Sequence, residues 1–183
     1  MVSKKNLLIV AGTGQNCGKT TLTEKVIEKI SKQQKITALK IAPHYYNQDH
    51  LPENNHTEKI HILKENDRSG KKDSSRMLLA GASEVFYIEA KDEHLKYGIK
   101  NIIELIPHNE AVICESGSLV NYITPGLFVM MQHEDPENRK TRHSSIINKV
   151  DAFCFFNGDC IEKFVENLRF TNGQWKLNKH CDE

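Results

Sequence analysis

The sequence has few cysteines and no long apolar run, and each shortage excludes a class of protein. Five cysteines occur among 183 residues, and their odd number, without any C-x-x-C pair, is unlike a disulfide framework. No apolar run approaches the roughly 20 residues that span a bilayer. The apolar stretch Leu7–Val10 is too short for a signal peptide. We therefore expect a cytoplasmic protein with reduced thiols and no membrane contact.

The charge balance excludes a strongly basic protein. Lysine and arginine together number 25 against 24 aspartates and glutamates, which gives a formal net charge of +1. Proteins that bind nucleic acid normally carry a clustered basic excess. The pairs Lys4-Lys5 and Lys71-Lys72 are more typical of solvated surface. We expect no nucleic-acid partner.

Short apolar runs alternate with amphipathic stretches, and the length suits one domain, residues 1–183. The runs predict strands at Leu7–Ala11, Ile36–Ala42, Val85–Ile88, Ala111–Cys114, Leu127–Met131 and Ala152–Phe156. Apolar residues at helical spacing predict helices at Thr20–Ile30, Ser74–Ala82 (with Asp73 as its N-cap), Glu93–Ile106 and Ile161–Leu168. Asn172-Gly173 predicts a hairpin within Phe170–Leu177. This order predicts an α/β fold with a mostly parallel central sheet covered on both faces and a C-terminal hairpin.

One stretch departs from this alternation. From His44 to Arg76 the chain is polar and contains only the short apolar patch Ile60–Leu63. We expect residues 44–72 to form one long polar loop, and such loops in compact domains are functional or mobile. This loop follows the second strand, at the sheet edge where ligands bind in open α/β folds.

The strongest functional signal is a strand, a glycine-rich turn, Gly-Lys-Thr and a helix. Curled glycine-rich backbone points N–H groups at phosphate oxygens, and the helix adds its positive dipole end. Lys19 supplies a charge to the β- and γ-phosphates, and the Thr20 hydroxyl ligates Mg²⁺. The spacing differs from G-x-x-x-x-G-K-[ST], because Thr13 stands where the first glycine is expected. We predict a three-layer P-loop NTPase fold whose nucleotide contacts are Gly12, Thr13, Gly14, Gln15, Asn16, Cys17, Gly18, Lys19, Thr20 and Thr21.

A carboxylate ends the fourth predicted strand. Glu115 follows the apolar run Ala111–Cys114, where P-loop proteins place an acid that holds Mg²⁺ through water or positions the attacking water. We predict Lys19 and Glu115 as catalytic, with Thr20 and Glu115 at the metal. Asp49 is the further candidate for the metal, and Asp67 and Asp73 compete with it. A surface or helix-capping acid is the alternative role for Glu115.

Two sequence features bear on the nucleotide base. Asn148-Lys149-Val150-Asp151 matches the guanine motif N-K-x-D, but the better strand follows it instead of preceding it. We interpret Ser144–Lys149 as the end of a helix and Asp151 as the start of a strand, with the guanine motif as the alternative. Asn157, after the last predicted strand, is another candidate base contact. Lys40, at the end of the second strand, could neutralise phosphate charge or contact substrate.

A second motif carries a family resemblance. The segment from Ser69 to Arg76, then Ala80-Gly81-Ala82 and Val85, resembles the G-K-D-S-x-R…A-G-A…V signature of the molybdopterin-guanine dinucleotide biosynthesis protein B family. Lys40 and His44 stand where that family carries a Lys-His pair. The resemblance implies a P-loop fold, GTP binding with weak hydrolysis, Mg²⁺ and a homodimer. It also implies a partner protein, because the family assists attachment of GMP to molybdopterin.

Other resemblances keep two further functions open. The run from Glu115 to Val120 is similar to a motif of nickel-metallochaperone GTPases and, more loosely, of dethiobiotin synthetase. The Gly12–Thr20 loop resembles the dethiobiotin synthetase form in length, which implies an ATP-dependent kinase or ligase. The histidines of the polar stretch could hold Zn²⁺ or Ni²⁺, although none forms an i, i+4 pair. They are His44, His50, His56 and His61.

Overall fold

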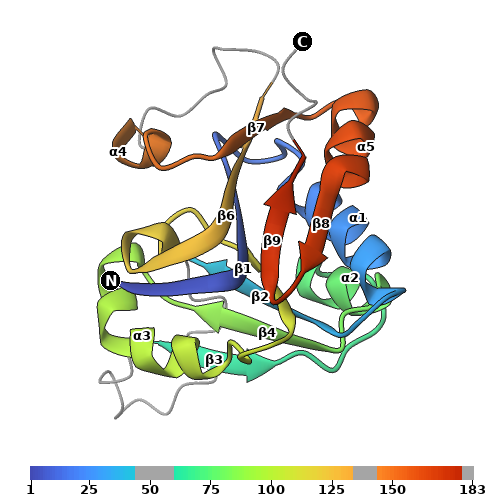
Figure 1. Cartoon of the computed structure of the whole chain (residues 1–183). Coiled ribbons are helices and arrows are strands. Elements are labelled where there is room, and N and C mark those ends of the chain that lie inside the picture. The colour runs from blue at the N-terminus through green and yellow to red at the C-terminus, as the bar shows by residue number, and fades with distance from the viewer. Residues whose placement is uncertain (44–59, 134–143, 179–183) are drawn as a thin grey trace.

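The computed structural model describes residues 1–43, 60–133 and 144–178, and its elements alternate as expected (Figure 1). The strands are β1 (Val2–Gly12), β2 (Ile36–Ala42), β3 (His61–Lys64), β4 (Glu84–Glu89), β5 (Ala111–Glu115), β6 (Ile123–Gln132), β7 (Ala152–Phe155), β8 (Leu168–Thr171) and β9 (Gln174–Leu177). The α-helices are α1 (Lys19–Ser31), α2 (Asp73–Leu79), α3 (Leu95–Glu104), α4 (Ser144–Ile147) and α5 (Gly158–Asn167). Short 3-10 turns occur at η2 (Asp92–His94) and η3 (Leu119–Asn121).

Seven strands form one sheet in the order β3-β4-β2-β5-β1-β6-β7. Every neighbouring pair is parallel except β3 with β4. The predicted α/β fold with a mostly parallel central sheet is therefore confirmed. β1 lies inside the sheet, parallel to its neighbours β5 and β6, so the turn that follows it opens at the carboxyl edge of the sheet. Ligands of open α/β sheets bind at that edge.

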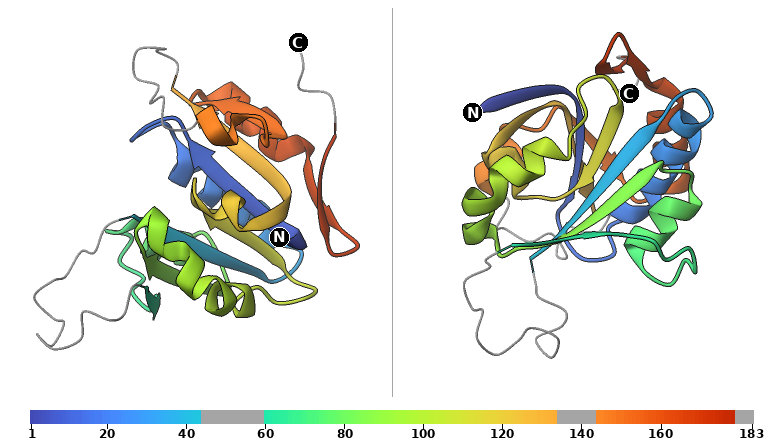
Figure 2. Two further views of the ribbon diagram at one scale, coloured as in Figure 1. Left: turned by 90° about the vertical axis from the view of Figure 1, so that its left-hand side faces the viewer. Right: turned by 90° about the horizontal axis from the view of Figure 1, so that it is seen from below.

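Helices cover both faces of the sheet, which gives three layers (Figure 2). On one face α1, α2 and α5 pack over a core that includes Leu8, Ala38 and Ile113. On the other face α3, η3 and α4 pack over a core that includes Ile9, Leu39 and Cys114. Successive residues of a strand point to opposite faces. The near-continuous apolar runs of β1, β2 and β5 therefore supply both cores.

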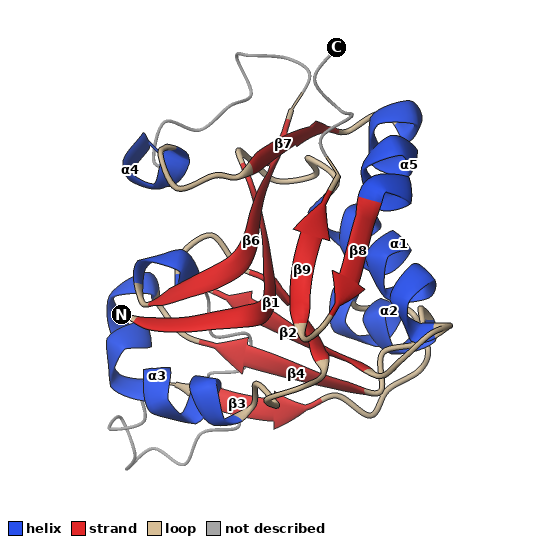
Figure 3. Ribbon diagram, viewed as in Figure 1, coloured by secondary structure: helices blue, strands red, loops and turns tan. Residues whose placement is uncertain are grey.

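The predicted C-terminal hairpin is also present, as β8 and β9 beside the main sheet (Figure 3). Asn172 and Gly173 form its turn with φ of 53° and 70°, the two positive values that a tight hairpin turn of this kind needs. The Trp175 indole Nε1 donates to the backbone oxygens of Asn6 at 2.8 Å and Val112 at 3.2 Å. This buried side chain fixes the hairpin to β1 and β5.

The structure corrects three expectations. Residues 44–72 are not one continuous loop, because His61–Lys64 form β3, paired antiparallel with β4. Asp73 is not an N-cap, because Lys72 caps α2 and Asp73 is its first residue. The predicted helix 93–106 is split into η2 and α3. No helix within the described ranges is long and apolar enough to span a membrane.

Candidate functional site

Two neighbouring strands, β2 and β5, bring polar side chains to one row at the carboxyl edge of the sheet. Glu115 of β5 is paired with Val10 of β1 on one side and with Lys40 of β2 on the other. Residues paired across parallel strands point to the same face. Lys40 and Glu115 therefore lie on the face covered by α1 and α2, one step beyond the apolar positions Ala38 and Ile113. The strand of Glu115 is therefore a direct neighbour of β1.

The Gly12–Thr20 loop joins β1 to α1 in a conformation that two of its residues make possible. Asn16 has φ of 55°, and Gly18, the N-cap of α1, has φ of 87°. A side chain at Gly18 would also collide with the Phe156 ring, so this position requires glycine. The Thr13 backbone N–H donates to the Met131 oxygen at 2.9 Å, which holds the loop against β6. No acidic residue lies in the first turn of α1, so the helix itself places no negative charge at its positive end.

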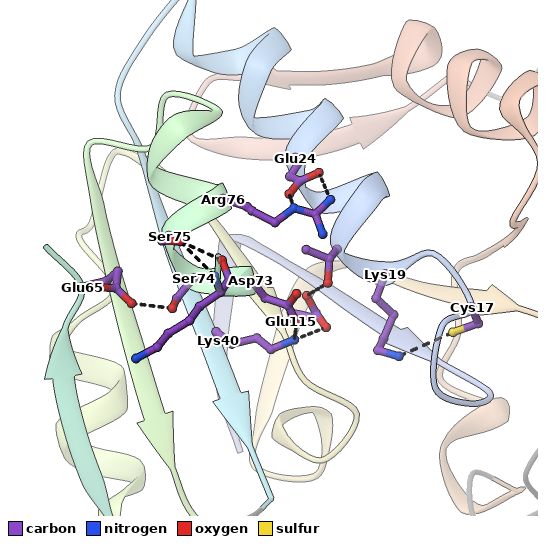
Figure 4. Close-up of polar contacts among 12 residues, drawn as sticks. Cys17, Lys19, Glu24, Lys40, Glu65, Asp73, Ser74, Ser75, Arg76 and Glu115 are labelled. Atoms are coloured by element: carbon purple, nitrogen blue, oxygen red, sulfur yellow. Dashed lines mark hydrogen bonds and ion pairs between the residues drawn. The ribbon is translucent and has the colours of Figure 1, made fainter. Parts of the chain in front are cut away.

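Lys19 folds back over this loop (Figure 4). Its ammonium Nζ donates to the Gly14 oxygen at 2.7 Å and lies 3.5 Å from the Cys17 sulfur. Cys17 is fully buried and donates to the same Gly14 oxygen at 3.2 Å. The Cys17 thiol therefore packs beneath the loop, while Lys19 is held by a backbone carbonyl that a stronger anionic acceptor could replace.

Thr20 links the loop to the strand-end acid. Its hydroxyl donates to the Glu115 Oε2 at 3.1 Å. Only 3% of Glu115 is exposed, and its other oxygen accepts a hydrogen bond from Lys40. Taking a carboxylate out of water is costly unless charge and hydrogen bonds compensate. Here the Lys40 ammonium and the Thr20 hydroxyl provide that compensation.

Asp73 completes the cluster from α2 (Figure 4). Its Oδ2 lies 2.9 Å from the Lys40 Nζ. Burial acts to raise the pKa of Asp73, but the hydrogen bond and charge of Lys40 outweigh it and hold this pKa below its usual value. Burial likewise acts to lower the pKa of Lys40, but Glu115 and Asp73 outweigh it and raise this pKa. Both groups are therefore charged near neutrality.

Two further contacts position α2 beside the cluster. The Arg76 guanidinium pairs with Glu24 of α1, with Nη2 to Oε2 at 2.8 Å and Nε to Oε1 at 2.5 Å. The buried Ser74 hydroxyl donates to Glu65 Oε2 at 2.6 Å. The G-K-D-S-x-R-like segment thus contributes Asp73 to the site, whereas Ser74 and Arg76 connect α2 to the rest of the fold.

The other residues predicted to contact nucleotide or metal lie in several parts of the chain. Gln15 and Asn16 are exposed on the loop, and Thr21 is half-buried on α1. Asn157 follows β7 and caps α5, because its side-chain oxygen accepts from the Cys160 N–H at 2.7 Å. Asp49 lies outside the described residues, as do His44, His50 and His56. His61 begins β3.

Asp151 lies directly before β7, one residue ahead of the strand start at which we predicted it. Its backbone N–H donates to the Phe128 oxygen at 2.9 Å, and its carboxylate accepts from the Phe128 N–H at 2.7 Å. It therefore fastens the amino end of β7 to β6. The preceding residues Ser144–Ile147 are helical, which confirms the interpretation of this segment as helix followed by strand.

Comparison with known proteins adds no relative: no family model, curated protein or solved structure matches this chain. What the site can do therefore follows from its own groups. The Lys19 ammonium and the N-terminus of α1 favour an anion. Beside them, the Thr20 hydroxyl and Glu115 offer the hard oxygen ligands that Mg²⁺ prefers. Among the described residues, no group of three His, Cys, Asp or Glu side chains could hold a metal ion by itself.

Proposed function

We propose that this chain binds GTP with Mg²⁺ and hydrolyses it weakly. The observation that carries the proposal is the contact between Thr20, which follows Lys19 at the start of α1, and the buried Glu115 on the neighbouring strand, at 3.1 Å. In P-loop proteins a lysine contacts phosphate, the next hydroxyl ligates Mg²⁺ and a strand-end acid supports the metal. The three groups lie together here although 95 positions separate Thr20 from Glu115.

Nucleotide binding would replace contacts that the loop makes with itself. The Lys19 ammonium would exchange the Gly14 oxygen, 2.7 Å away, for charged phosphate oxygens, which accept stronger hydrogen bonds than a neutral carbonyl. The phosphates would also meet the positive end of α1, which has 13 residues.

The residues present also fit Mg²⁺. Thr20 and Glu115 would hold the ion together with phosphate oxygens, and the ion would neutralise charge on the phosphates. Lys40 already pairs with the same Glu115 carboxylate. Metal binding and the Lys40–Glu115 ion pair would therefore share one acceptor group.

Slow hydrolysis is consistent with the ion pair between Arg76 and Glu24. Fast P-loop hydrolases place an arginine at the transferring phosphate, which raises the rate by several orders of magnitude. Arg76 lies on α2 beside the cluster, but its guanidinium is engaged by both oxygens of Glu24 (Figure 4). Its charge already serves the contact between α1 and α2.

The segment that contributes Asp73 to the cluster supports an assignment to one biosynthetic pathway. It is the segment that resembles the signature of the molybdopterin-guanine dinucleotide biosynthesis protein B family. We propose that the chain assists attachment of GMP to molybdopterin together with a partner protein of that pathway.

Fluorescent GTP and ATP analogues, titrated with and without Mg²⁺, test this proposal. We expect tighter binding of the GTP analogue and a marked loss of affinity without Mg²⁺. Lys19→Ala should weaken binding at least tenfold, because it removes the positive charge next to the phosphates. Thermal unfolding should show that the variant stays folded, since Lys19 is half-buried and has no core packing role.

Lys32→Ala is the matched control, because Lys32 is an exposed lysine just beyond the other end of α1. It should bind the analogues as the unaltered chain does. Equal loss in both variants would indicate a general charge effect and contradict a site at the Gly12–Thr20 loop. A clear preference for ATP would contradict the guanine assignment and favour a kinase or ligase.

A further inference from the structure

Two cysteines face each other where β7 leads into α5, in a segment that the proposed function does not use. The sulfur atoms of Cys154 and Cys160 lie 3.2 Å apart. Cys154 is fully buried on β7, whereas Cys160, in the first turn of α5, is partly exposed. Only five residues separate them, so the contact belongs to one compact turn.

Cys160 is the more accessible of the two sulfurs. The Phe155 backbone N–H donates to the Cys160 sulfur at 3.2 Å. Cys160 is also the third residue of the ten-residue helix α5, at the N-terminal end of that helix. The Cys154 sulfur lies 3.2 Å from the Cys160 sulfur, and its thiol faces the Phe155 backbone oxygen at 3.6 Å. Cys160 thus has the exposure of an attacking thiol, and Cys154 is placed to resolve the product.

We propose that Cys154 and Cys160 form a reversible disulfide by exchange with a low-molecular-weight disulfide such as glutathione disulfide. The Cys160 thiolate attacks one sulfur, the S–S bond breaks, and one glutathione leaves as its thiolate. Cys154 gives its proton to solvent and attacks the Cys160 sulfur of the mixed disulfide, and the second glutathione leaves. Two protein thiols are oxidised to one disulfide, and one glutathione disulfide is reduced to two glutathiones.

The bond would form next to the Gly12–Thr20 loop. Between the two cysteines, Phe156 packs its ring against Gly18, leaving no room for a side chain there. Disulfide sulfurs lie about 2.05 Å apart, so the turn that carries Phe156 must tighten from the 3.2 Å contact. This movement should lower nucleotide affinity several-fold in the oxidised protein, an expectation that rests on the proposed function.

Peptide mapping of the whole chain tests the disulfide directly. The protein is incubated with increasing glutathione disulfide, quenched in acid, denatured, alkylated with N-ethylmaleimide and digested with trypsin. Cleavage after Lys149 and Lys163 places both cysteines in one peptide. We expect this peptide to lose both alkyl groups and two hydrogen atoms, and dithiothreitol to restore alkylation at both positions.

Each single variant and one internal control sharpen the result. Cys154→Ser should stop at a glutathione adduct on Cys160, and Cys160→Ser should leave Cys154 largely unmodified because it is buried. Cys114, whose pKa burial raises, should remain a free thiol throughout.

A peptide that keeps two alkylated thiols, or a stable glutathione adduct on the unaltered chain, would overturn the proposal. This readout needs no nucleotide and no variant. A disulfide that forms in a protein that binds no nucleotide in either redox state would instead refute the proposed function and leave the redox pair in place.

Discussion

At the scale of single residues, the site depends on one lysine between two acids. Lys40 is 15% exposed at its side chain and bridges the buried Glu115 and the half-exposed Asp73. Removing one partner of a buried pair is more costly than the pair is worth, because the other charge is then uncompensated. We therefore expect Lys40 and Glu115 to matter more for stability than the exposed pair Lys64–Glu84.

The Lys40–Asp73 pair predicts a specific pH dependence of stability. Lys40 holds the pKa of Asp73 below its ordinary value of 3.8 in the folded chain, so the folded state binds a proton less readily than the unfolded state. The stabilisation is fully present above about pH 4 and is lost as the pH falls through the folded pKa. Asp73→Asn should cost up to about 1 kcal/mol near neutrality, a small value because solvent screens this half-exposed group.

Urea titrations of both proteins between about pH 2 and 7 measure this effect, and the two curves should converge at the acid end. Glu104→Gln is the control, because Glu104 is an exposed acid at the end of α3, which covers the opposite face of the sheet from Lys40. A difference between Asp73→Asn and the unaltered chain that stayed constant down to pH 2 would show that the carboxylate charge is not its source.

The sequence predicted the central residues of the cluster and missed one of its connections. Lys19 and Thr20 were identified because their motif is contiguous, and Glu115 because a buried strand ends at it. Asp73 was only one of three competing acids, since its contact with Lys40 spans 33 positions and depends on how α2 packs. A local sequence pattern carries no information about how α2 packs. Only the motif resemblance therefore indicated that this segment matters.

At the scale of elements, the predicted strands that contribute to both cores all exist. The missed strand, β3, does not contribute to both cores. In β3 Ile62 is half-buried while Leu63 and Lys64 are exposed, and it pairs only with β4 at the sheet edge. Four residues of this kind provide neither a continuous apolar run nor a long alternation. β1 also extends back to Val2, because pairing with β6 stabilises its polar residues.

The close pairing of β1 and β6 predicts that position 126 tolerates no side chain. The register between these strands shifts between Lys4 and Leu8, and a Cβ added at Gly126 would overlap the Lys5 carbonyl oxygen. Backbone on both sides must then move, so Gly126→Ala should lower the free energy of unfolding by about 2 kcal/mol or more. Urea denaturation followed by circular dichroism measures this loss.

Gly158→Ala provides the matched control for this substitution. A Cβ at Gly158, the first residue of α5, would meet no atom within 4 Å. Alanine is also the better helix former, so its effect should lie within about 0.5 kcal/mol of zero or be stabilising. Similar losses at Gly126 and Gly158 would contradict the close approach of β1 and β6.

At the scale of the whole molecule, the C-terminal hairpin belongs to the same core as the Gly12–Thr20 loop. Leu168, Phe170 and Trp175 pack in the cluster that also contains Cys17 and Leu22. The Phe170 and Trp175 rings meet edge to face with centroids 5.1 Å apart. Lys29 of α1 also donates to the Val165 and Leu168 oxygens at 2.6 and 2.9 Å. Unfolding of the hairpin should therefore disrupt α1 and the sheet as well.

Trp175 is the only tryptophan of the chain, so its fluorescence reports on the hairpin while far-ultraviolet circular dichroism reports on the whole fold. If one core connects them, the two signals should give the same urea midpoint, as in a two-state transition. Trp175→Phe keeps an aromatic ring but leaves the Asn6 and Val112 oxygens without the indole donor. This variant should lose about 1–3 kcal/mol of stability and shift the whole dichroism transition. A fluorescence change that preceded the dichroism change in the unaltered chain would show that the hairpin unfolds on its own and that the Gly12–Thr20 loop does not depend on it.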